Sequence, residues 1–219
     1  MISGLFKRDS TEASRLKSRV PRHSSGWKVL QQRLKSESGL RVMDVGPTSS
    51  QNINLLTNMG HSVYMADLVS AAFLPEYWKP SADESPKATS AKVSSVLDVA
   101  SFFEQETALD SRVFDCILLW ATLDYLPQPL IEPLIEKIYE ATEPGSQVFL
   151  FFHRQLNGPL NQYCRYHLTH DETVEMQAVE SHPVERIYTN RAIEKLFSKF
   201  SSYRFFLAKD DLYEAMITR

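Results

Sequence analysis

Two aspartates lie at the ends of short apolar segments in the first third of the chain. Asp44 stands near the end of LRVMDV, just before Gly46, and Asp67 ends SVYMAD about 20 residues after that glycine. A carboxylate can accept hydrogen bonds from both hydroxyls of a ribose, and a glycine turn lets a ligand approach the backbone. This spacing predicts a site for a ribose-bearing ligand at the ends of two strands. The alternative for each aspartate is that it caps the helix that follows it.

The turn that begins at Gly46 reads GPTSSQ, and it excludes two kinds of phosphate site. It has neither the G-x-G-x-x-G pattern of dinucleotide sites nor the G-K-[ST] sequence of a P-loop. Pro47 has no N–H to donate and fixes its own φ, whereas Thr48, Ser49 and Ser50 offer hydroxyl groups. The turn is compatible with a ligand that carries a ribose and no phosphate.

A second group of candidate residues follows FDCILLW, the strongest buried-strand pattern in the chain. Trp120 ends this segment and either faces a ligand or belongs to the core. Asp124 and Tyr125 come next, and they either position a substrate or pack at the entrance of a helix. His153 ends another apolar segment and is the candidate general base at this edge.

The stretch 154–186 has no clear period and is expected to be irregular and to select the substrate. Within it, Tyr163 and Arg165 are candidates for contacting an anionic or aromatic substrate, with a plain surface role as the alternative. His167 and His170 are close in sequence, but no thiolate or H-E-x-x-H context accompanies them, so we expect no metal site.

These residues need strands and helices to position them, and the sequence alternates between the two. Helical spacing of apolar residues predicts helices over about 25–37, 50–59, 129–142 and 190–200. Continuous apolar runs predict strands over 40–46, 62–67, 114–120 and 146–153, and a terminal hairpin over 203–208 and 213–218. Strands that are apolar on both faces call for a parallel sheet covered by helices on both sides, which is an α/β fold.

Composition fits one domain with an unusual charge distribution. The 219 residues are 43% hydrophobic with a net charge of -3, yet residues 1–41 hold ten Lys and Arg against three acids. We expect a basic flexible arm over 1–24 and a domain over 25–219. The arm has no interleaved aromatics, so we expect no nucleic-acid partner. Without a long apolar run, a secretory signal or a disulfide framework, we expect no membrane span and a cytoplasmic location.

In chain order, five segments resemble the motifs of class I S-adenosylmethionine-dependent methyltransferases. They are LRVMDVGPTSSQ, HSVYMADL, FDCILLWATLDYL, EPGSQVFLFF and RFFLAKDDLYEAMITR, within residues 27–219. The resemblance implies a Rossmann-like sheet of seven strands, mostly parallel, with helices on both faces and an antiparallel last strand. The first motif departs from the family's usual D-x-G-x-G-x-G, because the turn keeps only its first glycine, Gly46, and carries Pro47 and Ser49 after it.

The resemblance also implies a cofactor, S-adenosylmethionine, and residues that hold it. Asp67 would bind the ribose and Leu68 would lie beside the adenine, while the remaining cofactor positions would be Asp44, Gly46, Pro47, Thr48, Ser49, Asp98, Val99 and Trp120. The implied activity is in-line transfer of a methyl group to an acceptor that is a small molecule or a modified macromolecule. The alternative is a non-catalytic methyltransferase-like binding or interaction module whose cofactor site is degraded.

Overall fold

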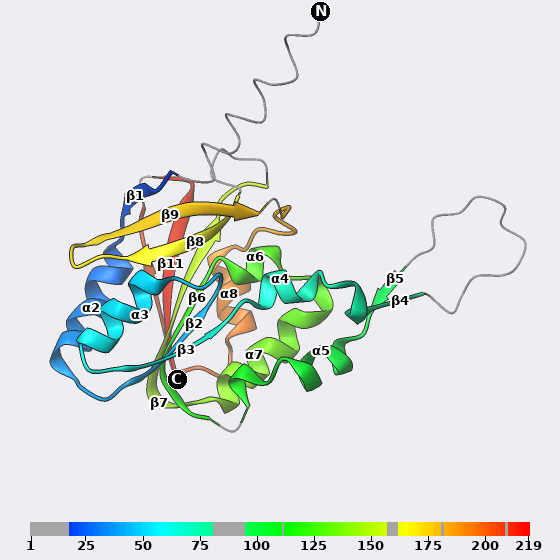
Figure 1. Ribbon diagram of the computed structural model, residues 1–219, viewed down its shortest axis with the longest axis horizontal. Helices are drawn as coiled ribbons and strands as arrows, with labels where there is room; N and C mark the ends of the chain where they lie inside the picture. Colours follow the sequence, from blue (N-terminus) through cyan, green and yellow to red (C-terminus); the bar gives the residue numbers. More distant parts are fainter. Residues whose placement is uncertain (1–17, 81–94, 111, 157–161, 181, 209) are drawn as a thin grey trace, which may run out of the picture.

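The computed structural model describes residues 18–80, 95–110, 112–156, 162–180, 182–208 and 210–219. Within these residues, six strands form the central sheet of a mixed α/β domain (Figure 1). In spatial order they are β10 (Ser202–Phe206), β11 (Leu212–Thr218), β7 (Thr142–His153), β6 (Phe114–Trp120), β2 (Arg41–Val45) and β3 (Ser62–Ala66).

All of these strands except β11 run in the same direction. The strands β3, β2, β6 and β7 pair in parallel, while β11 is antiparallel to both β7 and β10. The predicted α/β class and reversed last strand are confirmed, but no seventh strand joins this sheet in the described part of the chain. The short β5 (Ser95–Leu97) pairs instead with β4 (Trp78–Pro80) in a separate two-stranded sheet.

Helices cover both faces of the central sheet. Their bounds are α2 (Ser25–Ser36), α3 (Ser50–Asn58), α4 (Leu68–Ala72), α5 (Val99–Gln105), α6 (Thr122–Tyr125), α7 (Ile131–Glu140) and α8 (Asn190–Leu196). In Figure 1, α2 and α3 lie on one side of the sheet, and α5 and α7 lie on the other. This arrangement is the one that right-handed crossovers between parallel strands produce when they lead in opposite directions from the middle of a sheet.

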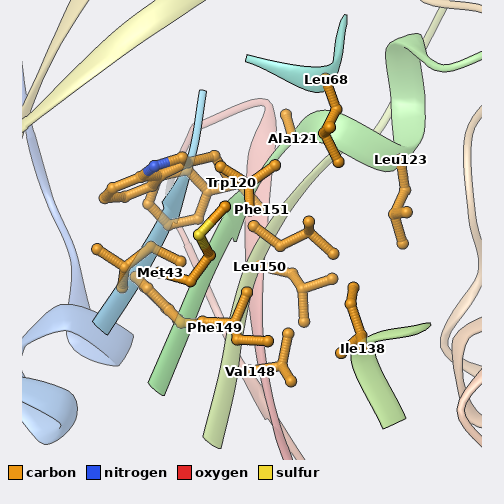
Figure 2. Close-up of a cluster of buried hydrophobic side chains, with 14 of the residues drawn as sticks. Met43, Leu68, Trp120, Ala121, Leu123, Ile138, Val148, Phe149, Leu150 and Phe151 are labelled. Atoms are coloured by element: carbon orange, nitrogen blue, oxygen red, sulfur yellow. The ribbon is translucent and has the colours of Figure 1, made fainter. Parts of the chain in front are cut away.

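Successive side chains of β7 point to opposite faces of the sheet and contribute to the core on both sides. Figure 2 shows Phe149 on one side of the strand and Val148 and Leu150 on the other, where Ile138 of α7 lies. All four side chains are fully buried. Burial of side chains of this size stabilises a fold by about 1.5–3 kcal/mol each. The strand is apolar on both faces because both faces are covered.

The prediction that the stretch 154–186 is irregular is wrong for much of its described part. It contains a hairpin of β8 (Tyr163–Leu168) and β9 (Thr173–Glu180), and β9 also pairs with β1 (Val20–His23). The hairpin lies across the end of the central sheet where β2 and β6 terminate (Figure 1). Period-two patterning does not reveal β8, because most of its side chains are buried on both faces, including Cys164 and His167.

The boundary predicted for a flexible arm at residue 24 is also wrong for its last residues. Val20–His23 form β1, and Arg22 is 6% exposed. Its guanidinium binds the buried Glu214 carboxylate at 2.6 Å and Asp210 at 2.9 Å. The chain is therefore clamped to β11 before α2 begins. Residues 1–17 of the predicted arm lie outside the described residues.

Within the described ranges, no helix combines the length and the apolar character that crossing a membrane requires.

We predict that Arg22→Ala lowers the free energy of unfolding by about 3–5 kcal/mol, because it removes the counter-charge of a buried carboxylate. Arg19→Ala is the matched control. Arg19 pairs with Glu175 with 42% of its side chain exposed, and its loss is expected to cost less than about 1 kcal/mol. Chemical denaturation measures both variants, and equal losses would contradict the buried clamp.

Candidate functional site

The sheet has a topological switch point between β2 and β6. The connection after β2 leads through α3 to β3 on one side, and the connection after β6 leads through α7 to β7 on the other. Ligands of open parallel sheets bind outside the carboxyl ends of the strands at such a point. The register aligns Asp44 of β2 with Leu118 of β6 and with Met65 of β3. Asp44, Trp120 and Asp67 therefore end neighbouring strands at one edge.

Asp44 is a buried carboxylate held by two side chains. One oxygen accepts a hydrogen bond from the indole N–H of Trp120 at 2.6 Å, and the other accepts one from the amide of Asn52 at 2.7 Å. The carboxyl group is 2% exposed, and burial raises its pKa to about 6 although both hydrogen bonds lower it. Asp44 is thus tied into the protein rather than turned toward solvent.

Trp120 turns its indole across the end of β2. Its φ of 46° lies in the left-handed region that a bulky residue rarely adopts. The hydrogen bond to Asp44 holds this conformation, as does a stack on Tyr166 with ring centroids 4.8 Å apart. A Cβ atom on Gly46 would lie 3.4 Å from the indole Cδ1. The indole therefore covers the face of the glycine turn.

The rest of the turn is bound to β8. The Ser49 hydroxyl caps α3 and lies 2.8 Å from Nδ1 of His167. Asn52 donates to the carbonyl of Tyr166 and accepts from the N–H of Leu168. Pro47 is partly exposed and Thr48 is exposed, so of the four predicted turn residues only Gly46 and Ser49 are buried.

Asp67 is partly buried and performs two tasks. It caps α4 by accepting hydrogen bonds from the N–H and the hydroxyl of Ser70, as the alternative reading of the sequence proposed. It also accepts a hydrogen bond of 2.5 Å from the hydroxyl of Tyr163 on β8. The carboxylate that would bind a ribose is thus bonded to a tyrosine hydroxyl.

The other three predicted cofactor residues are Leu68, which is buried in the core, and Asp98 and Val99, which lie at the start of α5. Leu68 is 2% exposed and belongs to the core cluster that contains Trp120 and Ala121 (Figure 2). Asp98 caps α5, which begins at Val99, and pairs with Lys79 of β4. The position of Asp98 and Val99 beside an adenine remains a prediction.

The predicted substrate residues Asp124 and Tyr125 meet the candidate base His153 in a buried cluster. One oxygen of Asp124 accepts hydrogen bonds from the backbone N–H of His153 at 2.7 Å and from its Nδ1 at 2.8 Å. The Nε2 atom of His153 lies 3.3 Å from the hydroxyl of Tyr125. Burial raises the pKa of Asp124 to about 6, and its second oxygen has no hydrogen-bond partner among the described residues.

Arg165 does not join this cluster; its guanidinium contacts Gln177 on β9. Among the described residues, no group of three or more His, Cys, Asp and Glu side chains could hold a metal ion. The sequence did not predict the contacts of Asn52 and Tyr166, because these contacts depend on where β8 lies. The one local signal is that Asn52 lies in the first turn of the predicted helix over 50–59; its burial is seen only in the structure.

The implied cofactor can be tested against these contacts. A ribose needs the Asp67 carboxylate, and a methionine end needs the face of the Gly46 turn. Both features are present at the switch point. In this structure Tyr163 is bonded to the first and Trp120 covers the second, so a cofactor would have to displace side chains to reach them.

Comparisons with known proteins give a distant likeness. No protein-family model and no curated protein matches the sequence. TehB from Haemophilus influenzae has a TM-score of 0.42 at 10% identity, and the match covers 88% of this chain and 62% of TehB. A 1,6-didemethyltoxoflavin-N1-methyltransferase from Burkholderia thailandensis, solved with S-adenosylhomocysteine, has a TM-score of 0.45 at 14% identity. The match covers 98% of this chain and 81% of that protein. A SAM-dependent methyltransferase from Methanosarcina mazei has a TM-score of 0.47 at 18% identity, and the match covers 87% of this chain and 96% of that protein. Likeness at this level does not by itself define the fold or the activity of the chain.

Because burial raises the pKa of Asp44 from 3.8 to about 6, its contribution to stability is fully present below about pH 4 and is lost as the pH rises through 6. We predict that the wild type loses up to about 3 kcal/mol of unfolding free energy relative to Asp44→Asn between pH 4 and pH 7. Urea titrations at both pH values measure this difference. The contributions of Asp124 and of His167, whose pKa burial lowers, are common to both proteins and cancel. Parallel pH profiles would contradict the assigned shift.

Proposed function

We propose that this chain is an S-adenosylmethionine-dependent methyltransferase that binds its cofactor at the switch point between β2 and β6. The observation that carries the proposal is the alignment of Asp44, Gly46 and Asp67 at the carboxyl ends of neighbouring parallel strands. A ligand that has a ribose and no phosphate suits the acid after β3 and the turn without a phosphate pattern.

In this proposal each part of the edge has a separate task. Asp67 accepts the ribose hydroxyls, and the turn from Gly46 to Ser49 holds the methionine end. Leu68 provides an apolar wall for the adenine, and we propose that Asp98 and Val99 flank the adenine on its other side. The bound cofactor would supply an electrophilic methyl group to an acceptor, and a protein can accelerate such a transfer largely by positioning the two reactants.

The acceptor would lie on the side of α6. His153 and Asp124 form an oriented acid–base pair, and Tyr125 links that pair to Tyr163 through a ring contact. We propose that His153 accepts a proton where the acceptor is protonated, and that Tyr125 and Tyr163 border the acceptor. Arg165 is proposed as a substrate contact at the outer edge of the hairpin. The acceptor is proposed to be a small molecule or a modified macromolecule.

A second candidate function is a non-catalytic module that no longer takes up the cofactor. The observation that favours it is the occupation of both acids and of the glycine face by the protein's own side chains. In that case the Trp120–Tyr166 stack is a permanent part of the core.

Calorimetry with S-adenosylhomocysteine distinguishes the two functions. The methyltransferase proposal predicts binding to the full chain and a rise in melting temperature, because a ligand of the folded state stabilises it by mass action. Absence of both effects at millimolar ligand, in the wild type and in Tyr163→Phe, would favour the module.

We further predict that Asp67→Ala, made in Tyr163→Phe so that both proteins compared lack the Tyr163–Asp67 hydrogen bond, weakens S-adenosylhomocysteine binding relative to Tyr163→Phe by about 1.5–3 kcal/mol, or about 10- to 150-fold in Kd. Asp67→Asn should retain the cap and lose the charge-assisted strength. Thr189→Ala is the control, since it removes the cap of α8 away from the site and should leave Kd unchanged. Unaltered affinity in Asp67→Ala would remove the ribose assignment.

A further inference from the structure

The hairpin residue Tyr163 makes a contact that the proposed reaction does not require. Its hydroxyl donates to Oδ1 of Asp67 at 2.5 Å, and Tyr163 is 3% exposed. A tyrosine hydroxyl on a carboxylate repeats the hydrogen bond that a ribose hydroxyl would make there. Both oxygens of Asp67 also accept from Ser70, Oδ1 from its N–H and Oδ2 from its hydroxyl, so a ribose hydroxyl that binds Oδ1 competes with Tyr163.

A second residue of the same strand closes the glycine turn. Tyr166 stacks on Trp120 with an angle of 12° between the rings, and both side chains are less than 5% exposed. The stack places the indole against Gly46. Tyr163 and Tyr166 therefore reach the two halves of the proposed cofactor site from one strand, β8.

The hairpin is anchored to the element that follows the glycine turn. Gln51 and Asn52 in the first turn of α3 bind the backbone of β8 at Leu168 and Tyr166. On the other side, β9 pairs with β1, and Arg22 of β1 is clamped to β11. These contacts hold β8 over the site as one unit rather than through a single side chain.

We propose that the β8–β9 hairpin is an autoinhibitory element that competes with the cofactor for the switch point. In the closed state the Tyr163 hydroxyl is hydrogen-bonded to Asp67, and the Trp120–Tyr166 stack covers Gly46. The cofactor binds only when these contacts are broken, so its apparent Kd equals the intrinsic Kd divided by the fraction of open molecules. This inference rests on the proposed methyltransferase function.

The test is the affinity of Tyr163→Phe for S-adenosylhomocysteine, measured by calorimetry on the full chain. The variant keeps the aromatic ring and removes the hydroxyl that competes for Asp67. The apparent Kd is expected to fall by about tenfold, which is the population shift that loss of one charge-assisted hydrogen bond gives. Tyr203→Phe is the matched control, since the hydroxyl of Tyr203 donates to the carbonyls of Phe197 and Phe200, which lie outside the β8–β9 hairpin.

A second readout follows the backbone of β8 directly. In the closed state the Leu168 N–H donates to Asn52 and is protected from hydrogen exchange. Its exchange rate in the wild type should rise when S-adenosylhomocysteine saturates the protein.

The outcomes separate this inference from the proposed function. Binding by Tyr163→Phe that is tighter than that of the wild type, or binding by the variant alone, supports autoinhibition. If both proteins bind equally well, or the variant binds more weakly, the inference is overturned and the proposed function stands. If neither protein binds at millimolar ligand, both are overturned.

Discussion

The buried carboxylate of Asp44 determines the arrangement of the whole carboxyl edge of the sheet. A buried charge must be hydrogen-bonded, and its two donors are the indole of Trp120 and the amide of Asn52. Trp120 takes up a left-handed backbone conformation to reach it. Asn52 uses its remaining groups to bind the backbone of β8. The position of the hairpin thus follows from the need to satisfy one acid at the end of β2.

The same arrangement links stability to binding. Strained backbone persists only where neighbouring contacts hold it, and the contacts of Trp120 are those that close the glycine turn. Opening the site would break the stack on Tyr166 and the bond to Asp44, and would release the strain at residue 120. Trp120 and Tyr166 belong to the core cluster, and Trp120 also packs edge-on against Phe149, so opening the site would cost packing as well as hydrogen bonds.

Much of the fold was predictable because its signals are local. The apolar run 114–120, the stripe of α7 and the hairpin of β10 and β11 all occur in the structure. The strand pair β1–β9 was not predictable, since Val20 meets Met176 from the far end of the chain. Asp44 and Asp67 were identified by spacing alone. Trp120 and Tyr163 were candidates too, but their bonds to these two acids were not predictable, because a side chain that fills a site resembles one that lines it until the backbone is placed.

In the closed state the Trp120 indole covers the Gly46 turn, and under the proposed competition it leaves Asp44 when the cofactor binds. The most direct measurement is an NMR titration of the indole N–H groups with S-adenosylhomocysteine, with Trp120 assigned by Trp120→Phe. Trp78, whose indole binds the carbonyl of Ala72, is the internal reference. If the cofactor displaces the indole, the Trp120 resonance shifts at saturation while that of Trp78 does not. A bound ligand that leaves the Trp120 indole N–H unchanged would contradict it.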